Sequence, residues 1–240
     1  MGRILVIGGA GYVGRLLLPH LAARHEIRVL DRRPPGGGYQ YVVGDATDPV
    51  VLRTALDGVD ALVHGAMAPD GDERRAFDVN VTSVHLALLA AHEAGVPHAV
   101  HLSSMSVYDN VLGRRLPDES VPTDATDLYG LTKRLGEQVC QAAVARFGLS
   151  VNVLRLAFPT ADEVWPAWGK PRRPRRVKTP AGVPIDATAA SDLGRAVLAA
   201  LDHRNGFHVF TISGDRSAGL WSTAKAQTVL GWEPTFGIRT

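Results

Sequence analysis

Tyr129 and Lys133 lie four residues apart in the segment "DLYGLTKRLGE", and this spacing is the first feature of the sequence that could carry chemistry. On an α-helix, positions i and i+4 share a face, so a phenol and an ammonium would lie side by side. A free phenol, with a pKa of about 10, is a poor base at neutral pH. A neighbouring cation favours the phenolate. The pair could therefore transfer protons, although the spacing alone could also be a coincidence.

A glycine-rich loop follows the first apolar run of the chain. Gly8, Gly11 and Gly14 form a GxxGxxG pattern between the run 3–7 and a segment with helical spacing. Such a loop lets the backbone approach a pyrophosphate, and the helix N-terminus supplies free N–H groups and a positive dipole end. The pattern therefore predicts a dinucleotide site. Its first residues are Gly8, Gly11, Tyr12, Val13 and Gly14.

Asp31, at the end of the second predicted strand, bears on which dinucleotide binds. A carboxylate there would accept hydrogen bonds from the adenosine ribose hydroxyls and repel a 2′-phosphate, which favours NAD over NADP. Arg32 and Arg33 follow directly and could instead bind that phosphate, so NADP stays possible. Asp45, which precedes Ala46, could contact the adenine amino group; the alternative is a solvated turn aspartate.

The elements that must position these residues alternate along most of the chain. Short apolar runs predict strands at 3–7, 27–31, 39–45, 60–66, 98–104, 150–157 and 206–214. Helical spacing predicts helices at 12–25, 50–58, 73–95, 127–148, 190–203 and 222–232. This alternation predicts an α/β fold: a Rossmann-like, doubly wound parallel sheet with a small C-terminal substrate-binding subdomain. We expect a single domain over 1–240, with substrate-binding elements at about 156–188 and 213–240.

The segment 159–184 breaks this pattern, because it is rich in Pro and Arg and has no clear period. It predicts a long loop or a flexible lid. Cations gathered between 170 and 178 could hold a substrate carboxylate or phosphate, with Arg172 and Arg173 as candidates. The alternative is a solvated, mobile loop. A nucleic-acid patch is not favoured, because no aromatic platform or basic helix accompanies the cations.

The composition, with 45% hydrophobic and 21% charged residues, is that of an ordinary globular protein. The net charge of +2 does not indicate a basic surface of the kind that binds nucleic acid. The single cysteine, Cys140, favours a reducing, cytoplasmic location. No metal site is expected, because His98 and His101 would point to opposite faces of a strand. The run "ILVIGGAG" is too short for a membrane span, so no membrane contact is expected either.

Taken in order, the motifs resemble those of the extended short-chain dehydrogenase/reductase family, of the NAD-dependent epimerase/dehydratase type. They are GxxGxxG, "GD" at 44–45, "HGAMA" from His64, "NVTSVHLALLAA" from Asn80, "LSSMSVY", "YGLTK" and "LGWEP". The resemblance covers nearly the whole chain. Within the family, "LYGLTKRLGE" and "LWSTAKAQTVLGWEP" are most similar to the compact uronate dehydrogenases, which oxidise a free sugar acid with NAD.

The resemblance implies a role for each matching residue. Tyr129 would be the general acid/base, and Lys133 would hold the nicotinamide ribose and lower the pKa of Tyr129. Ser104 would hydrogen-bond the reacting oxygen. The cofactor would also be bordered by Gly65, Ala66 and Met67. Substrate contacts are expected from Ser104, Met105, Ser106, Phe158, Arg172 and Arg173.

Three serine and asparagine positions have structural alternatives. Ser103 and Ser106 are better explained as hydrogen-bonding residues at the strand end than as catalysts. Asn80 is better explained as a residue that ties the helix 73–95 to the fourth and fifth strands than as a substrate contact.

The sequence thus predicts an NAD-dependent oxidoreductase acting on a carbinol carbon of a sugar or sugar-derived, uronate-like anionic substrate. One alternative is a nucleotide-sugar epimerase with retained NAD, and another is a non-catalytic NAD(P)-binding sensor or scaffold. Dehydration is not expected, because Met105 and Ser106 stand where dehydratases of the family carry an acidic pair. Phe158 stands near the place of an asparagine in enzymes for nucleotide sugars. The resemblance also implies a homodimer.

Overall fold

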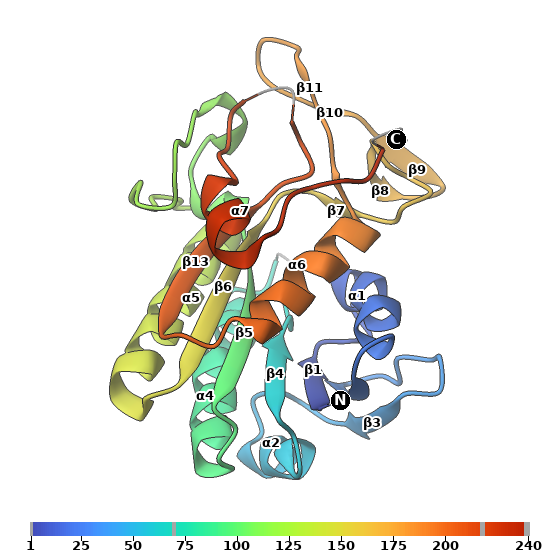
Figure 1. The fold of residues 1–240 in the computed structure, drawn as a ribbon. Coiled ribbons are helices and arrows are strands. Elements are labelled where there is room, and N and C mark those ends of the chain that lie inside the picture. Colours follow the sequence, from blue (N-terminus) through green and yellow to red (C-terminus); the bar gives the residue numbers. More distant parts are fainter. Residues whose placement is uncertain (1, 69–70, 217–218, 238–240) are drawn as a thin grey trace.

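The computed structural model describes residues 2–68, 71–216 and 219–237. Its core is a seven-stranded sheet in which every neighbouring pair is parallel (Figure 1). In spatial order the strands are β3 (Gln40–Val43), β2 (Glu26–Asp31), β1 (Arg3–Ile7), β4 (Ala61–His64), β5 (His98–Ser104), β6 (Ser150–Leu156) and β13 (Phe207–Ile212). The order reverses between β1 and β4, and ligands of open α/β sheets bind beside such a reversal.

Helices cover both faces of the sheet, which confirms the predicted doubly wound α/β fold. One face packs against α1 (Tyr12–Ala22) and α6 (Ala190–Asp202). The other packs against α2 (Pro49–Leu56), α4 (Ser83–Glu93) and α5 (Leu128–Phe147). Side chains alternate along β1 accordingly: Ile4 and Val6 join the first core, and Leu5 and Ile7 the second. Because both faces are covered, the strands read as continuous apolar runs.

The helix predicted at 73–95 is interrupted by a π-helical turn. The segment begins as α3 (Glu73–Phe77), widens into the turn Asp78–Thr82 and continues as α4. Such turns are frequent at functional sites. Asn80 is buried in this one, and its amide contacts lie outside the helix that carries it.

Short strands occupy the segment predicted as a long loop or lid. The hairpin of β8 (Trp168–Lys170) and β9 (Arg173–Arg175) is antiparallel, as is the pair β10 (Val177–Lys178) and β11 (Pro184–Ile185). β7 (Pro159–Thr160) pairs in parallel with β12 (Thr188–Ala189). Strands of two or three residues are too short to leave a periodic pattern in the sequence, so the prediction missed them.

A third apolar cluster supports the C-terminal part of the protein. It joins Met105 and Tyr108, after β5, to Val177, Ile185 and Trp221. The chain continues through α7 (Ala224–Leu230), and residues 232–236 then contact the start of α6 at Asp192. Of the predicted element 213–240, residues 217–218 and 238–240 lie outside the described residues. Within the described chain, every helix is too short or too polar to cross a membrane.

Candidate active site

A cavity of about 730 Å³ opens where the central strands end. Its walls include Ile7 at the end of β1, Asp31 at the end of β2, Ser104 at the end of β5 and Leu156 at the end of β6. This is the sheet edge at which parallel α/β proteins bind ligands.

The cavity brings together nearly all residues that the sequence singled out. The predicted cofactor residues on its wall are Gly8, Gly11, Tyr12, Val13, Gly14, Asp31, Arg32, Asp45, Ala46, Gly65, Ala66, Met67, Tyr129 and Lys133. The predicted substrate contacts on its wall are Ser104, Met105, Ser106 and Phe158. Their roles stay predictions, but residues from many separate elements share one cavity.

The glycine loop packs so tightly that two of its positions have no room for a side chain. Gly8 has a φ of +83°, and a Cβ there would lie 2.6 Å from the Ala66 backbone nitrogen. A Cβ at Gly14 would be equally crowded by the Gly8 carbonyl, so α1 could not begin so close to the loop with any larger residue. Gly11, the N-cap of α1, supplies no side-chain hydrogen bond to the first turn. The first turn of α1, whose Tyr12, Val13 and Gly14 line the cavity, therefore has N–H groups that no capping side chain occupies and that an anionic group could accept.

Asp31, at the end of β2, is held on the cavity wall by backbone N–H groups. Its Oδ2 accepts the Ala10 backbone N–H at 2.9 Å, and its Oδ1 accepts the Arg33 N–H at 3.2 Å. Arg32 and Arg33 lie on the same wall. The carboxylate is thereby oriented at the end of β2, where a ribose would lie.

Arg75 is a residue of this end that sequence reasoning missed. It comes from α3, lines the cavity and forms an ion pair with Asp45 at 2.7 Å. Burial acts to raise the pKa of Asp45, but hydrogen bonds from Arg75 and Thr47 outweigh it and hold the pKa below its usual value. No local signal could have found this pair, because its members lie on separate elements.

Lys133 is buried on α5 with its ammonium turned toward the strand ends. Its Nζ donates to the Leu102 carbonyl at 2.9 Å and lies 6.0 Å from the centroid of the Tyr129 ring. Burial lowers the pKa of Lys133 to about 8, although Glu137 nearby opposes this. At neutral pH the side chain is therefore still mostly a cation.

Two residues place the start of α5 beside the end of β5. The Asp127 side chain caps the helix by accepting the Gly130 N–H at 3.0 Å. Gly130, between Tyr129 and Lys133, has its backbone so close to the Ser106 carbonyl that a Cβ would collide with it. Glycine at this position thus lets the helix approach the turn that follows Ser104.

The serines at the end of β5 differ in what they contact. The Ser104 Oγ accepts the Ser106 N–H at 3.1 Å and lies on the cavity wall. Ser103 also reaches the wall, but its hydroxyl donates to Glu137 at 2.6 Å, as a structural strand-end residue would. Glu137 in turn forms a buried ion pair with Arg155 at 2.7 Å, so a charged network underlies the site.

Asn80 joins two parts of the site. Its Oδ1 accepts the Ala68 N–H at 3.0 Å, and its Nδ2 donates to the Thr132 hydroxyl at 3.0 Å. The sequence predicted a tie from this helix to the fourth and fifth strands. The amide instead ties it to the segment after β4 and to α5.

Beyond Ser104 and Tyr129, the cavity wall carries a group of apolar side chains and the guanidinium of Arg175. The apolar group includes Met105, Val111, Phe158 and Trp168. The Phe158 ring meets Trp168 edge-on at 5.5 Å, and the Arg175 guanidinium lies 4.4 Å from the centroid of the Trp168 ring.

All three arginines are exposed, but the described lining of the cavity includes Arg175 and does not include Arg172 or Arg173. The reason is the hairpin register, which pairs Arg175 with Trp168 across β8 and β9. The sequence alone does not reveal that register. The structure therefore does not bring Arg172 and Arg173 to the site.

Comparison with known protein families bears on this geometry. Residues 4–162 match the model of the NAD dependent epimerase/dehydratase family. The chain belongs to this family. Membership confirms the resemblance drawn from the motifs.

Individual relatives differ in what they act on. The chain is 39% identical over 174 residues to a 3 beta-hydroxysteroid dehydrogenase/Delta 5-->4-isomerase of Mycobacterium tuberculosis, a match covering 65% of this chain and 46% of that protein. It is 28% identical over 169 residues to the uronate dehydrogenase of Pseudomonas putida, covering 65% and 62%. The chain spans about half the length of the curated relatives that it matches most significantly.

A solved structure supports both fold and cofactor. A short-chain dehydrogenase/reductase superfamily protein from Agrobacterium tumefaciens with bound NAD superposes with a TM-score of 0.79 at 26% identity. The superposition covers 97% of this chain and 92% of that one.

Proposed function

We propose that the chain oxidises a carbinol carbon of a sugar-derived, anionic substrate, with NAD as the hydride acceptor. The observation that carries the proposal is that Ser104, Tyr129 and Lys133 line the same cavity as the glycine loop. A cofactor with its diphosphate over the glycine loop and its ribose at Asp31 would extend toward these three residues. A sensor or scaffold would not need them.

Tyr129 would take the hydroxyl proton of the substrate. Lys133 favours the phenolate because its ammonium lies one helical turn away and is shielded from water. An ammonium has three N–H groups, and the Leu102 carbonyl accepts one of them. The others can reach the ribose and the phenol.

Ser104 would hold the reacting oxygen. Its Oγ accepts the Ser106 N–H, which fixes the position of the hydroxyl, and its own proton can be donated to a substrate oxygen. Two groups from different elements would then fix the carbinol in one orientation, with Ser104 on β5 donating to its oxygen and the Tyr129 phenolate on α5 accepting its proton.

The anionic character of the substrate is inferred from Arg175. A guanidinium beside the aromatic side chains of Phe158 and Trp168 offers a bidentate hydrogen-bond donor to a carboxylate. Its contact with Trp168 restrains its orientation. The relationship to a uronate dehydrogenase supports the same substrate class.

A second candidate is the oxidation of an apolar ring alcohol. Met105, Val111, Phe158 and Trp168 give the substrate end few polar side chains, and a hydroxysteroid dehydrogenase is among the relatives. An epimerase with retained NAD is the third candidate, since the same residues could serve a hydride step in each direction.

We also propose a cytoplasmic location and a homodimer. Size-exclusion chromatography with light scattering tests the homodimer.

The deciding experiment is a substrate screen with the purified protein. D-glucuronate, D-galacturonate, D-glucose, UDP-glucose, UDP-glucuronate and a 3β-hydroxysteroid are each incubated with NAD, while NADH absorbance and product stereochemistry are followed. NADH formation with the uronates but not with glucose supports the proposal. Oxidation of the steroid alone would replace it with the second candidate, and inversion of a UDP-sugar without net NADH would establish the epimerase.

A further inference from the structure

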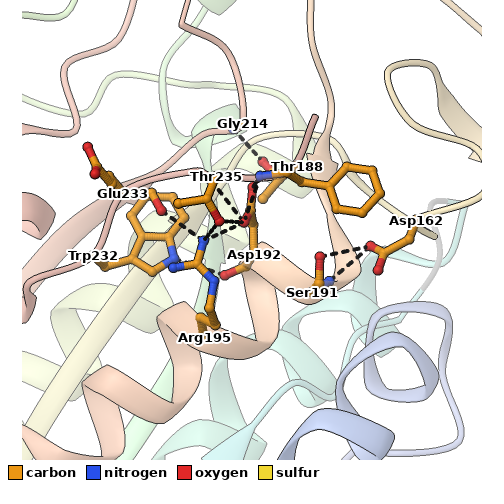
Figure 2. Close-up of polar contacts among 10 residues, drawn as sticks. Asp162, Thr188, Ser191, Asp192, Arg195, Gly214, Trp232, Glu233 and Thr235 are labelled. Carbon is orange, nitrogen blue, oxygen red and sulfur yellow. Dashed lines mark hydrogen bonds and ion pairs between the residues drawn. The ribbon is translucent and has the colours of Figure 1, made fainter. Parts of the chain in front are cut away.

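Asp192 is a buried carboxylate that holds the last described segment of the chain. It lies in the first turn of α6, with its side chain 3% exposed. It accepts the backbone N–H of Thr235 at 3.1 Å and forms an ion pair with Arg195 (Figure 2). It also accepts the backbone N–H of Phe236 at 3.1 Å. Its own carbonyl accepts the Trp232 indole N–H at 2.9 Å. We call residues 232–236 the C-terminal segment.

A buried carboxylate is stable only when charge-assisted hydrogen bonds replace its water. For Asp192, many of these hydrogen bonds come from the backbone of the C-terminal segment, whose Thr235 and Phe236 lie 43 and 44 residues further along the chain. The first turn of a helix also favours a negative charge. The segment is therefore fixed on α6 through its backbone, and its side chains are presented in a defined place.

The side chain that this arrangement presents to the rest of the protein is Phe236. Its ring meets Trp165 nearly edge-on, with the centroids 5.4 Å apart. Gly237 follows with a φ of +78°, and a Cβ there would collide with the Trp165 ring. The segment thus packs closely against Trp165.

Trp165 belongs to the loop that carries one wall of the candidate active site. Asp162 in this loop accepts the Ser191 N–H at 3.0 Å, which docks the loop on the start of α6 (Figure 2). The Pro166 carbonyl accepts the Ala187 N–H at 3.1 Å. β8 begins directly afterwards at Trp168, which lines the cavity together with Arg175.

The same hairpin reaches the cofactor end of the cavity. The Tyr12 hydroxyl, at the start of α1, donates to the Gly169 carbonyl at 3.0 Å. The hairpin β8–β9 therefore spans from the glycine loop to the aromatic substrate end, and its position affects both.

We infer that Asp192 and Phe236 are positioning residues, which hold the hairpin β8–β9 over the cavity through Trp165 and thereby slow the escape of bound ligand. Neither belongs to the described lining of the cavity, so their effect must pass through the packing. The inference rests on the binding of NAD by the family, and not on the identity of the substrate.

The test compares Phe236→Ala with Phe236→Tyr and with a matched control, Phe147→Ala. Phe147 is also a partly buried aromatic in a ring pair, with His92 at 5.0 Å, but it ends α5 away from the cavity. Amide hydrogen exchange is measured for residues 168–176 of the ligand-free proteins. The dissociation rate of NADH is measured by stopped-flow fluorescence, and thermal unfolding reports overall stability.

We expect Phe236→Ala to raise hairpin exchange and the NADH dissociation rate by about 3- to 10-fold, the size of one aromatic pair. Phe236→Tyr should restore both, because it keeps the ring. Phe147→Ala should lower thermal stability and leave both quantities unchanged. Asp192→Asn, which keeps the shape but removes the charge, should act in the same direction as Phe236→Ala.

Hairpin exchange in Phe236→Ala equal to that of the wild type would overturn the inference, as would an equal rise in Phe147→Ala. Raised exchange with an unchanged NADH dissociation rate would overturn it too, because the wall would then not retain ligand. If the wild type failed to bind NADH, the proposed function would be refuted. Amide hydrogen exchange would still decide whether the C-terminal segment holds the hairpin β8–β9 in place.

Discussion

Lys133 lies one helical turn beyond Tyr129 on α5, with its ammonium nitrogen 6.0 Å from the centroid of the phenol ring. The same nitrogen donates to the Leu102 carbonyl on β5, two residues before Ser104. Lysine therefore links the helix that carries the phenol to the strand that carries the serine. This link, together with Gly130 between Tyr129 and Lys133, explains why the segment "YGLTK" lies at the carboxyl end of β5.

The role of Tyr129 is tested by Tyr129→Phe, which removes only the hydroxyl. We expect turnover to fall by about 10²- to 10⁴-fold, because the proton then lacks its acceptor. NAD affinity should remain nearly unchanged. Tyr41→Phe, the same change on an exposed residue of the edge strand β3, is the control and should behave as wild type. Full turnover in Tyr129→Phe would refute the assignment of the base.

The lowered pKa of Lys133 gives NAD binding a pH dependence. Below about 8 the side chain is an ammonium that can hold the ribose, and above that pH it loses its charge. NAD affinity should therefore decrease as the pH rises through about 8. Lys133→Met should bind NAD weakly at every pH and remove this dependence. Calorimetric titration across pH about 6 to 10 measures both, since the range brackets the lowered and the ordinary lysine pKa. An unchanged pH profile in Lys133→Met would exclude Lys133 as its source.

Asp31 should determine the choice of cofactor. In Asp31→Ala the ribose loses its acceptor and the repulsion of a 2′-phosphate disappears, while Arg32 and Arg33 remain on the wall. We expect weaker NAD binding and less discrimination against NADP, measured as two dissociation constants. Asp57→Ala, at the exposed end of α2, is the matched control. The role would be rejected if both constants matched the wild type.

Arg175 should recognise the negative charge of the substrate. Arg175→Gln removes a charged hydrogen bond, so KM for a uronate should rise by about 10- to 100-fold, and KM for a neutral sugar should change little. Arg172→Gln, on the same hairpin but away from the cavity, should have no such effect. Equal effects of the two substitutions would point to general electrostatic attraction instead of a direct contact.

The sequence revealed the sheet and the cofactor end because both depend on local patterns. Apolar runs such as "RILVI" read as buried strands, and the crossover rules of parallel sheets leave few arrangements for them. Once the strands lie in one parallel sheet, Gly8, Asp31 and Ser104 must gather at one edge, because Asp31 and Ser104 end strands at their carboxyl ends and Gly8 follows one directly.

The substrate end could not be predicted in the same way. Arg175 reaches the cavity because of the register of a hairpin whose strands have three residues each, too few to show a period. The contacts of Arg75 with Asp45 and of Asp192 with Phe236 join segments far apart in the chain, and no local signal marks either. Tertiary packing, and not local propensity, decides these positions.

The buried imidazoles of His64 and His101 should make the protein sensitive to acid. They face each other across β4 and β5 with ring centroids 5.4 Å apart. Burial, and then the charge of Lys133, lowers the pKa of His64 to about 3 and that of His101 well below its usual value. The unfolded chain binds these protons near pH 6.5, so stability is complete above about 6.5 and is lost as the pH falls below it.

Each such histidine contributes a slope of up to about 1.4 kcal/mol per pH unit between about 6.5 and its folded pKa. His101→Leu removes one titrating group, and both ring nitrogens of His101 lack hydrogen-bond partners in the described structure. The variant should therefore lose stability less steeply in acid than the wild type, in urea unfolding measured from pH about 7 to 4.5. His92→Leu, on the exposed face of α4, should keep the wild-type slope. Equal slopes in wild type and His101→Leu would show that other groups control the acid sensitivity.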